Sequence, residues 1–133
     1  MRKLILALAL ISVCTIAEAA KKFPMTASSI VPAAKGELNI DEDKNGNVTL
    51  KIEVEHLSNP QNLTPPAAAY IVWLQEKSGS PQNLGVIRVD KSLKASFEAS
   101  TTSRSFELFI TGERDANAKF PAGPEVFRAN VKP

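Results

Sequence analysis

One acidic segment of the sequence has a spacing of oxygen ligands that suggests metal chemistry. Asp41, Asp43 and Asn45 alternate along it, and Gly46 follows directly. Side-chain oxygens at alternate positions before a glycine are typical of the first half of a calcium-binding loop. The last position of such a loop needs a bidentate glutamate, but Ile52 stands there. We therefore predict a charged hairpin turn, with weak surface calcium binding as the alternative.

The single histidine, His56, limits the catalytic chemistry that the chain can support. Catalytic zinc or copper sites need several nitrogen or sulfur ligands, and the sole cysteine, Cys14, lies in the N-terminal apolar segment. A Ser-His-Asp triad would rest on His56 alone, and Ser58 nearby lies in no nucleophile-elbow motif. Three glutamates are expected on different strands, without forming a carboxylate pair: Glu98, Glu107 and Glu113. The sequence therefore predicts a protein with no enzymatic activity, no catalytic residues and no cofactor.

Residues 1–19 have the order of a secretory signal peptide. A basic start, Arg2 and Lys3, is followed by an apolar run and then by Ala17-Glu18-Ala19. The apolar run has about fourteen residues, fewer than the roughly twenty that span a bilayer as a helix. We expect cleavage after Ala19, export to the periplasm or the extracellular space, and no membrane insertion of the mature chain. The alternatives are retention of this segment as an anchor and lipid attachment at Cys14.

The rest of the chain is expected to be one domain without a thiol. The whole chain has 133 residues, and its 16 Lys and Arg nearly balance its 14 Asp and Glu. Nucleic-acid binding needs clustered cations, whereas these charges are interspersed, so no nucleic-acid partner is expected. Residues 20–34 are predicted to form an irregular leader and residues 35–133 the folded domain. The oligomeric state stays open.

Alternating apolar and polar side chains predict β-strands along this domain. The clearest case is residues 48–55, where Val48, Leu50, Ile52 and Val54 alternate with charged or polar neighbours. Other strands are expected at residues 37–41, 67–74, 84–89, 94–100, 106–110 and 126–131. About seven strands without a helix predict an all-β, immunoglobulin-like β-sandwich.

The only tryptophan and the only tyrosine lie close together in the sequence. Tyr70 and Trp73 both belong to the almost wholly apolar segment 67–74. A short apolar run with aromatic and branched residues is typical of a strand that is covered on both faces. We therefore expect both side chains to fill the core between the two sheets.

Several uncommon residues of the second half resemble a known domain. They occur in this order: Tyr70-Ile71-Val72-Trp73-Leu74, Gly85, the segment 106–113, and Pro121-Ala122-Gly123-Pro124. Their order is similar to that in the extracytoplasmic C-terminal domain of the anti-sigma-K factor family, over residues 68–127. Arg114 stands where that family often has proline. The resemblance implies a similar fold, an envelope location and a sensing or protein-binding role, without the cytoplasmic part that captures a sigma factor.

These features lead to the expectation of an exported β-sandwich that binds another envelope protein or serves as an envelope accessory. Binding of calcium or a small ligand by the extracytoplasmic domain is the alternative. Exposed sheet edges pair readily with other chains, which makes an edge one candidate surface. Two loops are further candidates, because loops carry function on such scaffolds: the proline-rich loop 59–66 and the turn 120–124.

Overall fold

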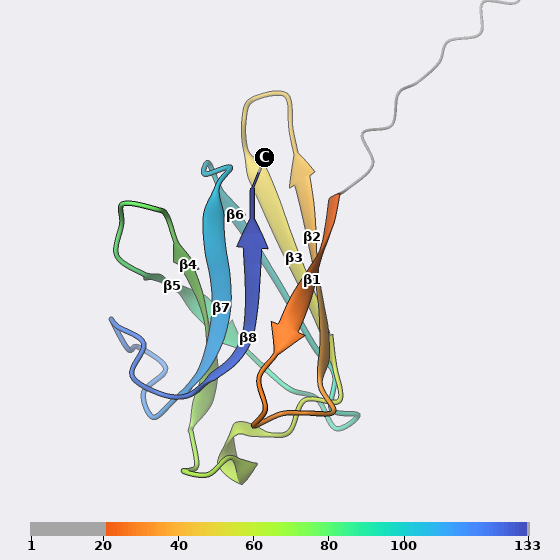
Figure 1. The fold of residues 1–133 in the computed structure, drawn as a ribbon, viewed down its shortest axis with the longest axis vertical. Coiled ribbons are helices and arrows are strands. Elements are labelled where there is room, and N and C mark those ends of the chain that lie inside the picture. Colours follow the sequence, from red (N-terminus) through yellow and green to blue (C-terminus); the bar gives the residue numbers. More distant parts are fainter. Residues whose placement is uncertain (1–20, 133) are drawn as a thin grey trace, which may run out of the picture.

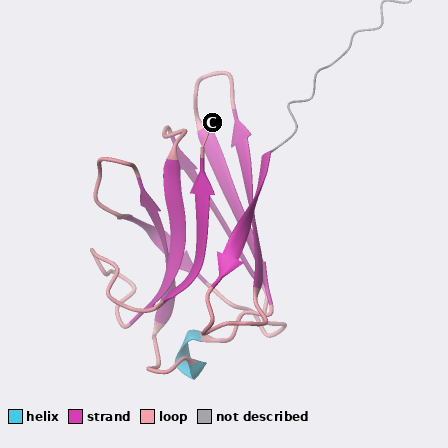
Figure 2. Cartoon of the chain, viewed as in Figure 1, coloured by secondary structure: helices cyan, strands magenta, loops and turns pink. Residues whose placement is uncertain are grey.

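The computed structural model describes residues 21–132 as an all-β fold (Figure 1). Its eight strands are β1 (Lys21–Ala27), β2 (Lys35–Glu42), β3 (Val48–Glu55), β4 (Ala69–Gln75), β5 (Gln82–Ile87), β6 (Ala95–Thr101), β7 (Phe106–Glu113) and β8 (Glu125–Val131). One short 3-10 turn, η1 (Pro60–Asn62), precedes β4 (Figure 2). Within residues 21–132 no helix has the length and apolar character needed to cross a membrane. The expected signal peptide, its cleavage site and Cys14 lie outside the described residues.

The strands form a sandwich that is nearly a closed barrel. Their order is β5-β4-β7-β8-β1-β2-β3-β6, and every neighbouring pair is antiparallel. β1 joins the two layers, because its first part pairs with β2 and its last two residues, Thr26 and Ala27, pair with β8. The two end strands, β5 and β6, come close together at Gly85 and Phe97. A Cβ atom added to Gly85 would lie only 3.3 Å from the Phe97 ring.

The predicted sandwich is confirmed, with one more strand than expected. The irregular leader predicted at residues 20–34 was wrong for Lys21–Ala27, which is β1. The local signal is weak there, since two lysines begin the segment and Pro24 interrupts it. Tertiary pairing with β2 and β8 and the burial of Met25 determine the strand instead.

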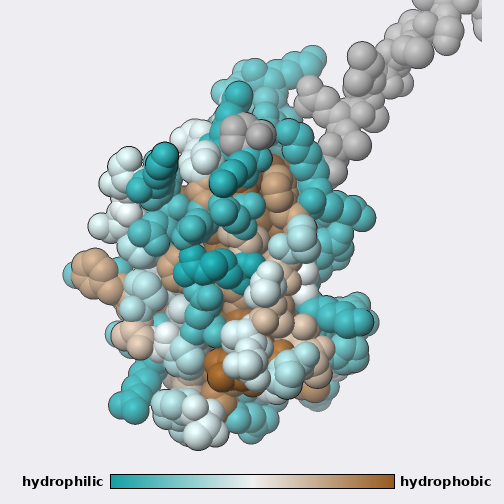
Figure 3. Space-filling model, in the orientation of Figure 1, coloured by the Kyte–Doolittle hydropathy of each residue, from teal (hydrophilic) through white to brown (hydrophobic). Residues whose placement is uncertain are grey.

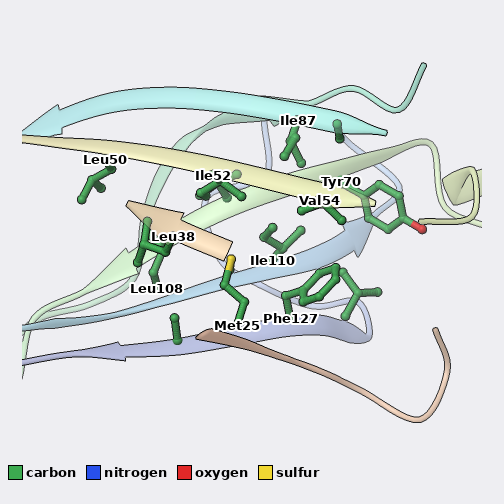
Figure 4. Packing of buried hydrophobic residues seen from close by; sticks show 14 of the residues in the cluster. Met25, Leu38, Leu50, Ile52, Val54, Tyr70, Ile87, Leu108, Ile110 and Phe127 are labelled. Carbon is green, nitrogen blue, oxygen red and sulfur yellow. The ribbon is translucent and has the colours of Figure 1, made fainter. Parts of the chain in front are cut away.

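The main core lies between the two layers (Figure 4). On β3 the predicted alternation is confirmed, since every second side chain from Val48 to Val54 is buried. Leu50 and Ile52 of β3 belong to the same buried cluster as Leu108 and Ile110 of β7 (Figure 4). Each such side chain stabilises the fold by about 1.5–3 kcal/mol relative to an exposed one.

Tyr70 and Trp73 lie on opposite faces of β4. Tyr70 is in the main core, and its hydroxyl donates a hydrogen bond of 2.6 Å to the carbonyl oxygen of Ser58. Trp73 forms a second cluster with Ile71 and Phe109 on the outer face of the same layer. The expectation that both residues fill the space between the sheets was therefore wrong for Trp73, because an odd separation along a strand reverses the face.

Burial gives Tyr70 a pKa that can be tested directly. Removal of its phenol from water raises the pKa from 10.0 to about 12. The stability that comes from the neutral phenol is thus complete below pH 10 and is lost as the pH rises from about 10 to about 12. Because Tyr70 is the only tyrosine, absorbance near 295 nm should follow it alone. We expect a midpoint near pH 12 for the folded protein and near pH 10 in urea; equal midpoints with native circular dichroism would contradict this.

Candidate functional site

The two loops singled out in the sequence lie side by side and line one pocket. Pro65 and Pro66 come from the β3–β4 loop, and Phe120 comes from the β7–β8 loop. The pocket has a volume of about 670 Å³, and its walls are mostly apolar. In Figure 1 both loops lie at the lower end of the sandwich, away from the β2–β3 turn. Phe120 is 68% exposed, which makes it the most exposed large hydrophobic side chain of the described residues. We call this feature the loop pocket.

A buried carboxylate, that of Glu113, fixes the wall of the loop pocket. Glu113 is only 3% exposed, although it ends β7 beside a loop. Its oxygens accept hydrogen bonds from the backbone N–H groups of Ala122 and Gly123, at 2.9 to 3.3 Å. The hydroxyl of Thr111 donates a further bond of 2.6 Å to Glu113 Oε2. Buried charge is tolerated when it is hydrogen-bonded in this way.

The same network connects the loop pocket to the outer aromatic cluster. Trp73 Nε1 donates a hydrogen bond of 2.7 Å to Thr111 Oγ1, and Thr111 in turn donates to Glu113. One continuous chain of hydrogen bonds therefore runs from β4 through β7 to the β7–β8 loop. Within the protein such chains strengthen one another. The position of the β7–β8 loop is thus linked to Trp73, whose side chain packs on the outer face of the sheet.

Gly123 allows the loop to approach the sheet closely. A Cβ built at this residue would lie 1.7 Å from the carbonyl oxygen of Gly112, which is far inside contact distance. The backbone N–H of Gly112 also donates a 2.9 Å hydrogen bond to the carbonyl oxygen of Pro124. The loop therefore rests directly on the backbone of β7.

The other arm of the β7–β8 loop covers the aromatic cluster. Ala118 packs against this cluster, which explains why Trp73 is fully buried although it faces outward. Asn83 of β5 holds the loop from the far side, since its Nδ2 donates to the carbonyl oxygens of Ala118 (2.9 Å) and Ala116 (3.3 Å). The loop is thus fixed at both ends of its path across the sheet.

Two members of this cluster form a row with a side chain of β8, so that three side chains stack across β4, β7 and β8. Trp73, Phe109 and Arg128 occupy directly opposite positions. The rings of Trp73 and Phe109 are stacked with their centroids 6.5 Å apart, and the Arg128 guanidinium lies 4.6 Å from the Phe109 centroid. Arg128 donates hydrogen bonds to Glu125 and Glu107, and both carboxylates raise its pKa, with the hydrogen bond to Glu125 as the largest cause.

The three glutamates are not distributed as expected. Glu107 and Glu113 both lie on β7, and only Glu98 lies on another strand, β6. The prediction of three different strands was wrong, because β7 continues past the apolar alternation to Glu113. The two carboxylates of β7 have separate partners, Arg128 for Glu107 and the loop amides for Glu113.

Of the calcium candidates, Asp43 and Asn45 lie in the β2–β3 turn, and Asp41 lies near the end of β2, where it pairs with Thr49. Asp43 Oδ1 accepts hydrogen bonds from the backbone N–H groups of Asn45 (2.8 Å) and Asn47 (2.9 Å). These bonds, with that of Asn47 first, lower the pKa of Asp43. Gly46 takes a left-handed φ of 81°, as a tight turn of this kind requires. The geometry is that of a hairpin turn held by its own aspartate.

His56 lies apart from the loop pocket. It follows β3 directly, is exposed, and has a left-handed φ of 56°. It is not among the residues that line the loop pocket. Across residues 21–132, no three His, Cys, Asp or Glu side chains are grouped so that they could hold a metal ion.

Sequence reasoning missed the role of four residues whose hydrogen bonds hold the β7–β8 loop in place: Trp73, Asn83, Thr111 and Glu113. The available signal was the pair Thr111 and Glu113, two polar residues with strand spacing at the end of an apolar run. Comparison with known proteins gave no help, since no family model and no curated protein matches the chain. The resemblance to the anti-sigma-K factor domain therefore stays a prediction.

Replacement of the Glu113 carboxylate should weaken the loop. In Glu113→Gln, one acceptor oxygen becomes an NH2 group that faces backbone N–H or hydroxyl donors. We expect the free energy of unfolding to fall by about 1–3 kcal/mol, measured by urea denaturation. Glu98→Gln is the matched control, because Glu98 is exposed on β6, and it should change stability by less than about 0.5 kcal/mol. Equal effects of the two variants would refute the role given to Glu113.

A methyl group at Gly123 should push the loop off the sheet. Because its Cβ would lie 1.7 Å from Gly112 O, Gly123→Ala should cost about 3 kcal/mol, the upper range for overpacking. Thermal unfolding followed by circular dichroism would measure this cost. Gly79→Ala serves as control, since its nearest neighbour would be 3.8 Å away. A Gly123→Ala protein as stable as the control would show that the loop sits elsewhere.

Proposed function

We propose that this protein is an exported β-sandwich module without enzymatic activity that binds another protein of the cell envelope through the loop pocket. The signal-like residues 1–19 support export, and the resemblance to the anti-sigma-K factor domain supports an envelope location. The observation that carries the binding role is Phe120, which is 68% exposed on a loop that is otherwise anchored.

An exposed aromatic side chain on an anchored loop is suited to protein binding. Aromatic residues often dominate the binding energy at the centre of protein interfaces. The anchoring bonds to Glu113 and Asn83 mean that the loop is already ordered before a partner arrives. Less conformational entropy is then lost on binding. Prolines at positions 65 and 66 stiffen the opposite wall in the same way.

The chemistry of the pocket also favours binding over catalysis. Its buried carboxylate, Glu113, is engaged by one hydroxyl and two backbone N–H groups. A general base needs a lone pair directed at its substrate, whereas these bonds direct the carboxylate of Glu113 at the protein itself. The remaining charged side chains of the lining, Arg114 and Asp115, are exposed and flank the apolar wall. They are placed to select a partner by charge at its rim.

Site-specific photo-cross-linking in the native envelope tests this proposal. A photoreactive aromatic residue at position 120 should capture one dominant protein, identified by mass spectrometry. The same residue at position 44, in the exposed β2–β3 turn, is the control and should not capture it. Phe120→Ser should reduce co-purification of that protein by about tenfold, the effect of losing one central aromatic contact. Identical products from positions 120 and 44 would contradict the proposal.

A further inference from the structure

The pairing of β1 with β8 ends abruptly, and the two strands then diverge. Their register contains only Thr26 with Arg128 and Ala27 with Phe127. Towards the start of β1 and the end of β8, Figure 1 shows a widening, V-shaped gap between them. All other neighbouring strands of the described chain are paired over five or more positions. The gap therefore interrupts an otherwise continuous sheet.

Pro24 explains why the ladder stops there. Ser28 N donates to Val126 O at 2.9 Å, which makes Ser28 and Val126 a hydrogen-bonded pair of the ladder. The pair Thr26 and Arg128, two residues earlier along β1, is of the same kind. Hydrogen-bonded pairs recur at every second position of an antiparallel ladder. The next one would join Pro24 to Asn130. Proline has no N–H to donate, so the edge of β8 from Asn130 onward is left without a partner from β1.

The charges on either side of the gap also oppose its closure. Continuation of the same register would place Lys22 directly opposite Lys132 on the outer face, where both are exposed. Like charges in directly opposite positions destabilise a strand pair. Lys22 also forms an exposed ion pair with Glu37 of β2, at 3.5 Å. Exposed pairs of this kind are weak, so the strip between the two lysines still favours a negatively charged side chain.

The floor of the gap is apolar. Figure 3 shows hydrophobic side chains at the surface where β1 and β8 diverge, bordered by hydrophilic ones. Phe23 of β1 is only partly buried against the main core. Phe23 and Ala129 line part of a groove of about 540 Å³, which continues along the paired positions of β1 and β8 as far as Ser28.

We infer that this gap, which we call the β1–β8 seam, accepts an extended segment of a partner protein that adds a strand to the edge of β8. The segment would alternate apolar side chains, directed at the core, with acidic side chains, directed between Lys22 and Lys132. Backbone pairing supplies the affinity in such strand addition, and the alternating side chains supply the selectivity. The seam lies on other strands than the loop pocket, so the inference does not depend on the function proposed for that pocket.

Two short peptides test the inference on the purified protein. The first alternates valine with glutamate over seven residues, and the second alternates valine with lysine; both carry a fluorophore and blocked ends. Fluorescence anisotropy should show binding of the glutamate peptide at least about tenfold tighter than that of the lysine peptide, since two ion pairs replace two repulsions. The preference should weaken at high salt.

Three variants locate the binding to the β1–β8 seam. Reversal of both charges, Lys22→Glu with Lys132→Glu, should invert the preference so that the lysine peptide binds more tightly. Lys91→Glu, exposed in the β5–β6 connection, is the control and should leave the preference unchanged. Pro24→Thr restores the missing donor, and it should raise the melting temperature while reducing peptide binding by about tenfold or more, because β1 can then pair with Asn130.

Each outcome decides the inference. Tighter binding of the glutamate peptide, inverted by the charge reversal, supports a partner strand of the stated chemistry. Equal binding of both peptides, no binding of either, or a preference untouched by the reversal would overturn it. Concentration-dependent dimerisation that Pro24→Thr abolishes would also overturn it, because the seam would then hold a second copy of this chain.

Discussion

The two layers of this sandwich are held in one sheet by β1, which changes its pairing partner part-way along its length. Its first five residues pair with β2, and its last two residues pair with β8. Without that change the layers would meet only through their side chains and turns. The change has a chemical origin in Pro24. The backbone nitrogen of Pro24 is directed at β8 and has no hydrogen to donate, whereas pairing with β2 does not need a donor at this position. The continuity of the fold and the gap in it therefore have the same cause.

At the opposite end of the molecule, one side chain, that of Glu113, likewise has two structural roles. Glu113 combines a hydroxyl from its own strand with two amides from the loop, so that one side chain orders both the sheet end and the pocket wall. Gly123 makes this possible because it lets the amides come within reach of the carboxylate. Together they convert a long connection into a surface of defined shape.

The sequence predicted those strands that have one buried and one exposed face. β3 is the clearest case, since its alternation from Val48 to Val54 predicts both the strand and the face that is buried. β1 was missed because Pro24 and the lysines obscure a pattern that depends on pairing with two distant strands. Trp73 was placed on the wrong face because a strand buried on both sides carries no alternation to read.

The candidate site was predictable only in its parts. Prolines marked both loops in the sequence, but nothing local in the sequence shows that the two loops meet. Glu113 looked like any other strand glutamate, because its partners are the backbone amides of residues that follow nine and ten positions later. Hydrogen bonds to the backbone leave no trace in the types of residues that donate them. Such contacts become visible only when the chain is folded.

The division of the apolar residues into two clusters has a consequence for how the protein opens. Ile71, Trp73 and Phe109 are separated from the main core by the sheet itself, and they are covered by Ala118 of the β7–β8 loop and by Arg128 of β8. We therefore expect that the β7–β8 loop can open locally, with loss of a small set of contacts, while the main core stays folded. Tyr70 reports on the interior and Trp73 on the outer layer. Each of the two apolar clusters thus contains one residue, a tyrosine or a tryptophan, whose absorbance or fluorescence can follow it.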